Sequence, residues 1–552
     1  MILASMDTIK QYTDIGVYSH DNLHDHFLKS AEKDPDRICV VDPPNRMELN
    51  GVAPERLTYR EFARAVDAVA EGLVNLGVKK DDIIMVQLPN TWELAMLYLA
   101  VARSGAIISP APVLWREAEM GYIAQTTEAK LFITVEEFNN FNHRAMGESI
   151  RSNNPGMDKV VTLEEIRAMV DGPVTGLLDE IPVDANDIFT ICWTSGTEAR
   201  SKGCPLSHNN WAGMARVQDA AGFQPGDVMM TAGPLVNMGA VGTVLIPWMV
   251  LGGTLVLHHP FDPVGFMTQI MTEKPNYTLM VPALANMIAK HPSVDSFDLT
   301  SFRSITMGSA PPSLWTMEEF KNRWDIDIGN IWGQNEGTGF IAGTEDVPDM
   351  ATRATSFPHY GKPGVVWKSS ASRHVQVKIL GPDDRELTDI GEVGELVYKG
   401  PGLLAGYFKN PEATERSFTD DGFFRTGDLF RIEENNMISF FERAKDIIIR
   451  GGFNISSQEI ENYILGHENV QDAAVVGMAD ETLGERMCVY VVPVPGQTLS
   501  LDGLVDFLNK KGVARYKHPE RLEITPVIPR NPVGKVLKKA LRQDIKEKLM
   551  TE

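Results

Sequence analysis

A chain of 552 residues is too long to fold around one hydrophobic core, so two or more domains are expected, and 43% hydrophobic residues suffice to fill them. The formal net charge of −22 and the isoelectric point near 5.0 argue against a general nucleic-acid-binding protein or a membrane-surface protein, because both need a broad cationic face. Small-molecule chemistry is favoured.

Cysteine usage and the N-terminal sequence indicate the cytoplasm. The four cysteines form no CxxC pair and are far too sparse for a disulfide-stapled secreted domain, so we expect reduced thiols and no zinc site. The first residues, MILASMDTIKQYTD, lack the basic start and apolar stretch of a secretory signal. A cytoplasmic protein without a transmembrane segment is predicted, and a homodimer is left open.

The first half of the chain alternates helix and strand patterns. Thr58-Tyr-Arg-Glu61 is a capping-box sequence that predicts a helix reaching about Leu76, and the apolar run Ile83–Leu88 predicts the next strand. Asn90 is expected to cap a second helix that ends near Gly105. The alternation predicts a largely parallel sheet covered by helices. Further strands of this kind are expected at Leu131–Val135 and Ile188–Trp193.

The segment Val228–Phe261 contains no Asp, Glu, Lys or Arg and is long enough to span a bilayer. Pro234, Pro247 and the Gly252-Gly253 pair divide it into short pieces. Buried strands and helices of an α/β core are therefore predicted rather than a membrane helix.

Downstream of residue 375 the pattern changes to short, turn-rich strands. A new unit is predicted from about Lys445, with helices at Ser457–Leu465 and Leu501–Lys511, strands at Ala473–Gly477 and Met487–Val492, and a final helix after Gly534. The predicted fold class is α/β. Residues 1–444 would form a large domain of mainly parallel βα layers with a β-rich subregion at about 375–444, and residues 445–552 a small, mobile α+β domain.

The cationic residues gather near the C-terminus. Residues 509–549 hold twelve Lys or Arg against four Asp or Glu, a net charge of +8. A solvated helix face and a contact with the phosphates of coenzyme A or ATP are equally weighted interpretations.

The strongest local motif is the Ser/Thr/Gly run from Trp193 to Gly203, which contains Lys202 and directly follows a predicted strand. Small residues let backbone N–H groups converge on phosphate oxygens, and a lysine adds a point charge. A Walker A loop is excluded, because Ser201 and Gly203 stand where that motif needs glycine and Ser/Thr. Taken alone, such a run is more often an ordinary surface turn.

Five further motifs follow in order: Gly308-Ser-Ala-Pro311, Ile331-Trp-Gly-Gln-Asn-Glu336, Arg425-Thr-Gly-Asp428, Arg443-Ala-Lys-Asp446 with Gly451-Gly-Phe-Asn454, and Pro529-Arg-Asn-Pro-Val-Gly-Lys535. With these motifs the chain resembles, over nearly its whole length, the adenylate-forming superfamily of acyl-CoA synthetases, carrier-protein adenylation domains and beetle luciferases. The resemblance implies a two-domain enzyme that uses ATP, Mg²⁺ and coenzyme A.

The resemblance also implies residue roles. Trp332 would stack on adenine, Asp428 would bind the ribose hydroxyls, and Glu336 with Thr197 would hold Mg²⁺. The alternatives are a core tryptophan, a turn aspartate and a solvated glutamate. The residues implied for ATP binding are Thr194, Ser195, Gly196, Thr197, Lys202, Gly308, Ser309, Ala310, Trp332, Gly333, Asn335, Asp428, Arg443 and Lys535.

Lys535, Lys202 and Asn335 are the expected catalytic residues. A carboxylate attacking the α-phosphate develops charge on phosphoryl oxygens, which the ammonium of Lys535 would stabilise. In the family the small domain then rotates about a hinge, here at Lys445, and presents a glycine-rich segment, here Gly451, Gly452 and Phe453, to coenzyme A. The competing interpretation of Lys535 is the start of a basic helix.

The chain departs from the family pattern at several positions. Glu198, Ala199 and Ser201 change the phosphate loop, for which a local rearrangement and weaker ATP binding are expected. Asn335 replaces a threonine that touches the α-phosphate, and Asn237 replaces a histidine at the mouth of the acyl pocket.

Asn237, Met238, Gly239, Val241 and Gly242 are the predicted acyl-pocket residues. No Lys, Arg or His lies among them to pair a second carboxylate, which favours a medium-chain aliphatic or alicyclic monocarboxylic acid. The predicted function is an ATP-dependent carboxylate–CoA ligase. An aryl-acid CoA ligase, an adenylation protein that loads a carrier protein, a luciferase-like oxygenase and a nucleotide-binding homologue without catalysis are the alternatives.

Overall fold

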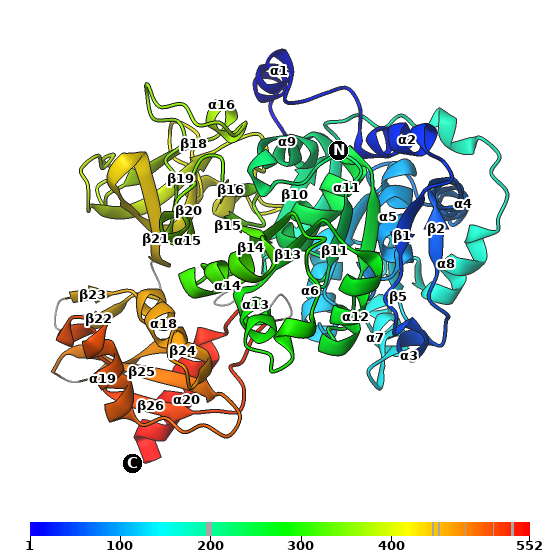
Figure 1. The fold of residues 1–552 in the computed structure, drawn as a ribbon. Helices are drawn as coiled ribbons and strands as arrows, with labels where there is room; N and C mark the ends of the chain where they lie inside the picture. The colour runs from blue at the N-terminus through cyan, green and yellow to red at the C-terminus, as the bar shows by residue number, and fades with distance from the viewer. Residues whose placement is uncertain are drawn as a thin grey trace.

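The computed structural model describes residues 1–194, 201–443, 446–450, 453–480, 482–511, 513–531 and 535–551. A large N-terminal part, blue to yellow in Figure 1, is joined to a smaller C-terminal part, orange to red. The expected mixed α/β class is confirmed.

An eight-stranded sheet forms one half of the N-terminal part. Its strand order is β16-β15-β14-β13-β11-β12-β1-β2, and every neighbouring pair is parallel except the two at the edges. The strands are β1 (Ile38–Val41), β2 (Arg56–Thr58), β11 (Val228–Thr231), β12 (Thr254–Leu257), β13 (Tyr277–Met280), β14 (Ser304–Met307), β15 (Asp327–Gln334) and β16 (Thr338–Ala342).

A six-stranded sheet of order β10-β9-β4-β3-β5-β8 forms the other half, and only its β9–β10 edge pair is antiparallel. The strands are β3 (Ile83–Gln87), β4 (Ile107–Pro110), β5 (Leu131–Thr134), β8 (Lys159–Thr162), β9 (Ile188–Trp193) and β10 (Gly203–Ser207). The predicted parallel βα layering is thus present, split over two sheets.

Helices fill the space between the two sheets and cover their outer faces. The central core contains residues of α2 (Leu23–Lys33), α4 (Tyr59–Asn75), α5 (Trp92–Arg103), α9 (His208–Val217) and α11 (Ile246–Leu251) together with strands of both sheets. The eight-stranded sheet packs outward on α12 (Pro263–Glu273), α13 (Pro282–Ala289) and α14 (Leu314–Trp324), and the six-stranded sheet on α6 (Glu117–Thr127) and α7 (His143–Ser152).

The start of α4 agrees with its sequence signal. The Thr58 side chain accepts from the Glu61 backbone N–H, and the Glu61 carboxylate accepts from the Thr58 N–H, which completes the predicted capping box. The predicted cap of α5 is wrong. Thr91 is the N-cap residue, and buried Asn90 instead accepts from the Leu235 N–H at 3.0 Å and donates to the Gly233 carbonyl at 2.8 Å. The polar atoms of a buried amide need hydrogen-bond partners, and here the loop after β11 supplies them.

The uncharged segment Val228–Phe261 lies inside this core. It forms β11, the short α10 (Met238–Ala240), the π-helical turn η3 (Val241–Leu245), α11 and β12. None of the helices in the described part of the chain combines the length and apolar character that a membrane crossing needs.

Two smaller β units follow. An antiparallel sheet of order β17-β21-β20-β19-β18 corresponds to the predicted β-rich subregion and comprises β17 (Ser356–Pro358), β18 (Gln376–Leu380), β19 (Val393–Lys399), β20 (Phe424–Ile432) and β21 (Met437–Arg443). The C-terminal sheet comprises β22 (Ile448–Arg450), β23 (Phe453–Ile455), β24 (Val470–Asp480), β25 (Gly484–Pro493) and β26 (Arg521–Ile524), packed with α18 (Ser457–Leu465), α19 (Leu501–Lys510) and α20 (Lys538–Thr551). The predicted α+β unit is present.

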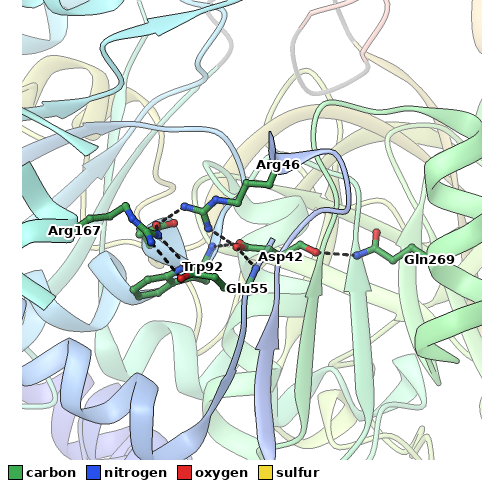
Figure 2. Close-up of polar contacts among 7 residues, drawn as sticks. Asp42, Arg46, Glu55, Trp92, Arg167 and Gln269 are labelled. Carbon is green, nitrogen blue, oxygen red and sulfur yellow. Dashed lines mark hydrogen bonds and ion pairs between the residues drawn. The ribbon is translucent and has the colours of Figure 1, made fainter. Parts of the chain in front are cut away.

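A buried ionic network lies where β1 meets the helices (Figure 2). Arg46 pairs with Asp42, which follows β1, and with Glu93 at the start of α5. Arg167 of α8 (Leu163–Val170) pairs with Glu55 at 2.8 Å and also contacts Glu93. Asp42, Arg46 and Glu93 are at most 2% exposed. This ionic network therefore joins elements of both sheets inside the core.

Candidate active site

The Ser/Thr/Gly segment is the connection of the β9–β10 hairpin. The Thr194 N–H donates to the Lys202 carbonyl at 3.0 Å, and the Lys202 N–H donates to Oγ1 of Thr194 at 3.0 Å. These two bonds fix the distance between the ends of the loop. Ser195, Gly196, Thr197, Glu198 and Ala199 lie outside the described residues, so their predicted roles stay predictions.

Lys202 and Glu336 meet on one tyrosine hydroxyl. Nζ of Lys202 donates to the Tyr407 hydroxyl at 2.8 Å and lies 3.9 Å from the centre of the ring. The same hydroxyl donates to Oε1 of Glu336 at 2.8 Å. Tyr407 is 5% exposed and Glu336 8% exposed. Lys202, the predicted phosphate-binding lysine, and Glu336, the predicted metal ligand, are thus linked through a buried neutral group.

A second cluster gathers around Asp428 of β20. Trp332 Nε1 and Gln334 Nε2, both of β15, donate to Oδ2 of Asp428 at 2.9 and 3.1 Å. Arg443 of β21 pairs with the other carboxylate oxygen at 3.4 Å. The Trp332 ring stacks on Phe340 with 4.9 Å between centroids. Three of the predicted nucleotide-binding residues are therefore brought together, with the indole anchored by its N–H.

The Asn335 amide connects three segments. Its Nδ2 donates to the Trp193 carbonyl at 2.8 Å, and its Oδ1 accepts from the Met238 N–H at 2.9 Å. Neighbouring Asn237 accepts from the Gly239 N–H at 3.1 Å and caps α10. The two predicted departures from the family pattern thus both use their side-chain oxygen to hold the beginning of α10.

Glycine is required where the 308–310 segment passes β15. A Cβ on Gly308 would lie 2.7 Å from Cγ2 of Ile331, and Ser309 has a left-handed φ of +72°. A left-handed conformation is uncommon for a residue other than glycine, asparagine or aspartate, and strained backbone of this kind clusters at active sites and ligand clamps. Ala310 is half-buried beside it, and Gly333 lies within β15.

Comparison with known proteins gives a match over most of the chain. Residues 27–408 match the model of the AMP-binding enzyme family, and residues 459–535 match the model of the AMP-binding enzyme C-terminal domain. The chain belongs to the AMP-binding enzyme family.

Relatives of this AMP-binding enzyme act on different acids. It is 30% identical to medium-chain fatty-acid–CoA ligase of Escherichia coli (strain K12), over 98% of this chain and 93% of the relative. It is 29% identical to 2,3-dihydroxybenzoate-AMP ligase of Bacillus subtilis (strain 168), over 98% of this chain and 96% of the relative.

Two solved structures share its fold. ATP-bound MatB of Rhodopseudomonas palustris has a TM-score of 0.79 at 24% identity, over 96% of this chain and 99% of that chain. The anthranilate CoA ligase AuaEII in complex with anthranoyl-AMP has a TM-score of 0.82 at 20% identity, over 98% and 99% of the two chains.

The predicted acyl-pocket residues of this AMP-binding enzyme lie on consecutive turns of α10 and η3. A Cβ on Gly242 would lie 2.9 Å from Sδ of Met238 and 3.3 Å from atoms of Met214 and Trp211. Val241 is fully buried and Gly239 is half-buried. The surroundings of Gly242 are therefore apolar, and π-helical turns such as η3 occur frequently at functional sites.

The remaining predicted residues belong to the C-terminal domain. The Lys535 N–H donates to Oδ1 of Asn531 at 2.8 Å, and the Lys535 carbonyl accepts from the Asn531 N–H at 2.8 Å. Phe453 begins β23. Lys445, Gly451 and Gly452 lie outside the described residues, as does the exact domain boundary at 444 and 445.

Sequence reasoning missed Tyr407 and Gln334. Tyr407 lies 205 residues from Lys202 and 71 from Glu336 along the chain, so no local spacing connects them. The glutamine stands inside a motif already noted, two residues after Trp332, on the same face of a strand. That alternation is the one signal that could have placed Gln334 beside Asp428.

Proposed function

We propose that this AMP-binding enzyme is a cytoplasmic, ATP-dependent carboxylate–CoA ligase. It would convert acid, ATP and coenzyme A into acyl-CoA, AMP and pyrophosphate through an acyl-adenylate. The observation that carries the proposal is the meeting of Lys202 and Glu336 on Tyr407 beside the Ser/Thr/Gly loop. One cation and one carboxylate at a loop rich in small residues suit a triphosphate with its divalent cation.

The Asp428 cluster suits the nucleoside. Asp428 already accepts two hydrogen bonds and an ion pair, so its carboxylate is held in one orientation, from which it can accept from ribose hydroxyls. Trp332 has Phe340 against its ring, and an adenine would stack on the indole in the same way. Gly308, Ser309 and Ala310 would lie along the base.

Glu336 fits a magnesium ion. Its Oε1 is occupied by Tyr407, and the described residues give Oε2 no hydrogen-bond or ion-pair partner. Mg²⁺ in nucleotide sites commonly takes one or two carboxylates together with phosphate oxygens and water. When bound, the cation would neutralise part of the triphosphate charge. Thr197 is the second predicted ligand.

Lys535 would supply the charge for the adenylation step. A carboxylate that attacks the α-phosphate brings two anions together, and an ammonium between them lowers that barrier. Asn335 would orient the reacting groups through the second N–H of its amide, since the first donates to the Trp193 carbonyl. For the thioester step we propose rotation of residues 445–552 about Lys445, which brings Gly451, Gly452 and Phe453 to coenzyme A.

A medium-chain aliphatic or alicyclic monocarboxylic acid is the proposed substrate. The 30% identical relative is a medium-chain fatty-acid–CoA ligase. The surroundings of Gly242 are Met238, Met214 and Trp211, and flexible methionines adapt to chains of different shape. An aryl acid is the second candidate, since the 29% identical relative is a 2,3-dihydroxybenzoate-AMP ligase.

The test is acid-dependent exchange of pyrophosphate into ATP over a panel of aliphatic, alicyclic and aryl acids, followed by thioester formation with coenzyme A. Exchange and thioester are both expected with medium-chain acids. No exchange with any acid would sink the adenylation proposal, exchange with aryl acids alone would favour the second candidate, and exchange without thioester would indicate a carrier-protein acceptor. Lys535→Ala should abolish acyl-AMP formation and largely spare thioester formation from supplied acyl-AMP.

A further inference from the structure

One buried hydroxyl separates the two opposite charges of the proposed triphosphate site. Tyr407 accepts from the Lys202 ammonium and donates to the Glu336 carboxylate, each at 2.8 Å. No ion pair among the described contacts joins Lys202 directly to Glu336. The hydroxyl is therefore the group that both charged side chains share.

Backbone bonds hold Tyr407 in this position from both sides. The Phe408 N–H donates to the Gly203 carbonyl at 2.9 Å, next to Lys202 in the chain. The Leu404 N–H donates to the Glu336 carbonyl at 3.0 Å. The Tyr407 N–H donates to Oγ1 of Thr414 at 2.9 Å. The loop that carries the ring is thus fastened to the chain segments of both partners.

Close packing adds a further constraint on this loop. Gly337, the residue after Glu336, has φ +84°, and a Cβ there would lie 1.8 Å from the Gly402 carbonyl oxygen. Only glycine permits this approach. A phenol is protonated at neutral pH, so the Tyr407 hydroxyl is a donor to the Glu336 carboxylate.

We propose that Tyr407 is a positioning residue of the MgATP site, whose hydroxyl keeps Lys202 and Glu336 from pairing with each other and holds both charges ready for the triphosphate and its cation. The inference rests on the proposed function, in which Lys202 and Glu336 bind MgATP. In this inference Tyr407 belongs to the MgATP site, although it would contact neither the reacting atoms nor the acid.

Without the hydroxyl the two charges are free to collapse into a direct ion pair. An ion pair in a partly buried site is strong, because the local dielectric is low. MgATP would then have to break that pair before either side chain could bind it. Because hydrogen bonds to charged groups are worth more than neutral ones, Tyr407→Phe is expected to raise the Kd of MgATP by about ten- to hundredfold.

The experiment is calorimetric titration of MgATP into the full-length wild type, Tyr407→Phe and Tyr398→Phe, without acid or coenzyme A. Tyr398 is the matched control, since it is a buried tyrosine whose hydroxyl donates to the Gly339 carbonyl at 3.3 Å and contacts no charged side chain among the described residues. A weakened Kd in Tyr407→Phe alone is expected. Equal Kd values in all three proteins would overturn the inference.

The mechanism through Glu336 is tested by a double-mutant cycle. In a Glu336→Gln background no carboxylate is left to capture Lys202, so adding Tyr407→Phe should change the Kd of MgATP less than threefold. Fully additive losses would contradict a positioning role. In steady-state exchange, Tyr407→Phe should raise KM for MgATP while KM for the acid stays within a factor of two.

If Tyr407→Phe does not fold, Lys202→Met and Glu336→Gln carry the test in the nucleotide-free protein. The two substitutions should then change the free energy of unfolding non-additively, because one hydroxyl bridges both side chains, and additive changes would refute the bridge.

The results also distinguish a failure of the proposed function from a failure of the inference about Tyr407. A wild type that binds MgATP but exchanges pyrophosphate with no acid refutes the proposed function while the Tyr407 comparison still decides the inference. A wild type that binds no MgATP overturns both.

Discussion

Two of the polar clusters described above, the ionic network and the cluster of Lys202, Tyr407 and Glu336, are built on different principles. In the ionic network, Arg46 contacts Asp42 and Glu93 directly, and these side chains are at most 2% exposed. In the active-site cluster, the neutral Tyr407 stands between Lys202 and Glu336, and Lys202 is half-buried.

This difference in how the charges contact one another determines which cluster can still bind a charged ligand. Charged side chains that contact one another inside a core are desolvated and neutralised by each other, so their role is to join secondary-structure elements. Removing one partner leaves the other as an uncompensated buried charge. Charges that share a hydroxyl keep unused donors and acceptors. In the described structure Arg46 Nε and Glu93 Oε2 also lack a hydrogen-bond partner, but both residues are fully buried. The second arrangement, with half-buried Lys202, is therefore the one open to a polyanion and its cation.

Replacing Arg46 should give the largest change in stability. Arg46→Met leaves the buried Asp42 carboxylate without its cation and Glu93 with Arg167 alone, which should lower the free energy of unfolding by about 3–5 kcal/mol. Urea denaturation of the full-length protein measures this loss. MgATP affinity of the folded fraction should stay unchanged, and a large loss of affinity at wild-type stability would remove the distinction between the clusters.

Glu336→Gln should show the reverse pattern. Removing the carboxylate that would hold Mg²⁺ is expected to slow pyrophosphate exchange on the order of a hundredfold, as when one electrostatic contact is lost from an active site. The melting temperature should fall much less than in Arg46→Met. Glu93→Gln is the matched control of the ionic network, and it should lower the melting temperature while leaving the KM of MgATP unaffected.

The ionic network should also respond to pH. Burial raises the pKa of Asp42 to about 6, against the pull of Arg46 in the opposite direction. The folded state therefore holds this proton more tightly than the unfolded chain, and this group adds stability as the pH falls through about 6. Relative to Asp42→Asn, the wild type should gain about 1.4 kcal/mol in unfolding free energy between pH 7 and pH 5. A difference that stays constant between the two pH values would argue against a raised pKa.

The smallest effect is expected at the rim of the same ionic network. Arg167 is 27% exposed and its partner Glu55 38% exposed, so solvent screens their attraction, and its other partner, buried Glu93, keeps Arg46 when Arg167 is removed. Arg167→Gln should lower the unfolding free energy by only about 1 kcal/mol. A loss as large as that of Arg46→Met would show that burial does not determine how much each ion pair of the ionic network contributes to stability.

Local sequence signals predict much of the fold. The Thr58 capping box begins α4, and the apolar period of Ser457–Leu465 predicts α18 with the bounds that the structure has. The order of six motifs points to the family. These signals succeed because each acts within a few residues along the chain.

Long-range contacts explain what the sequence does not reveal. Asp42, Arg46 and Glu93 resemble surface residues in sequence, since buried charges are rare and only tertiary pairing permits them. Asn90 has the composition of a helix cap, but it is buried and bonds to a loop far along the chain. Tyr407 gains its position from two partners that are distant in sequence.

The hairpin that carries the Ser/Thr/Gly segment has one further consequence. Thr194 and Lys202 close it with two hydrogen bonds, so the strands β9 and β10 are tied together outside the loop itself. Changes of composition between these two residues, such as Glu198 and Ala199, need not disturb the register of the sheet. The closed hairpin therefore allows the composition of this loop to change, and with it the proposed affinity for the nucleotide, without altering the pairing of β9 with β10.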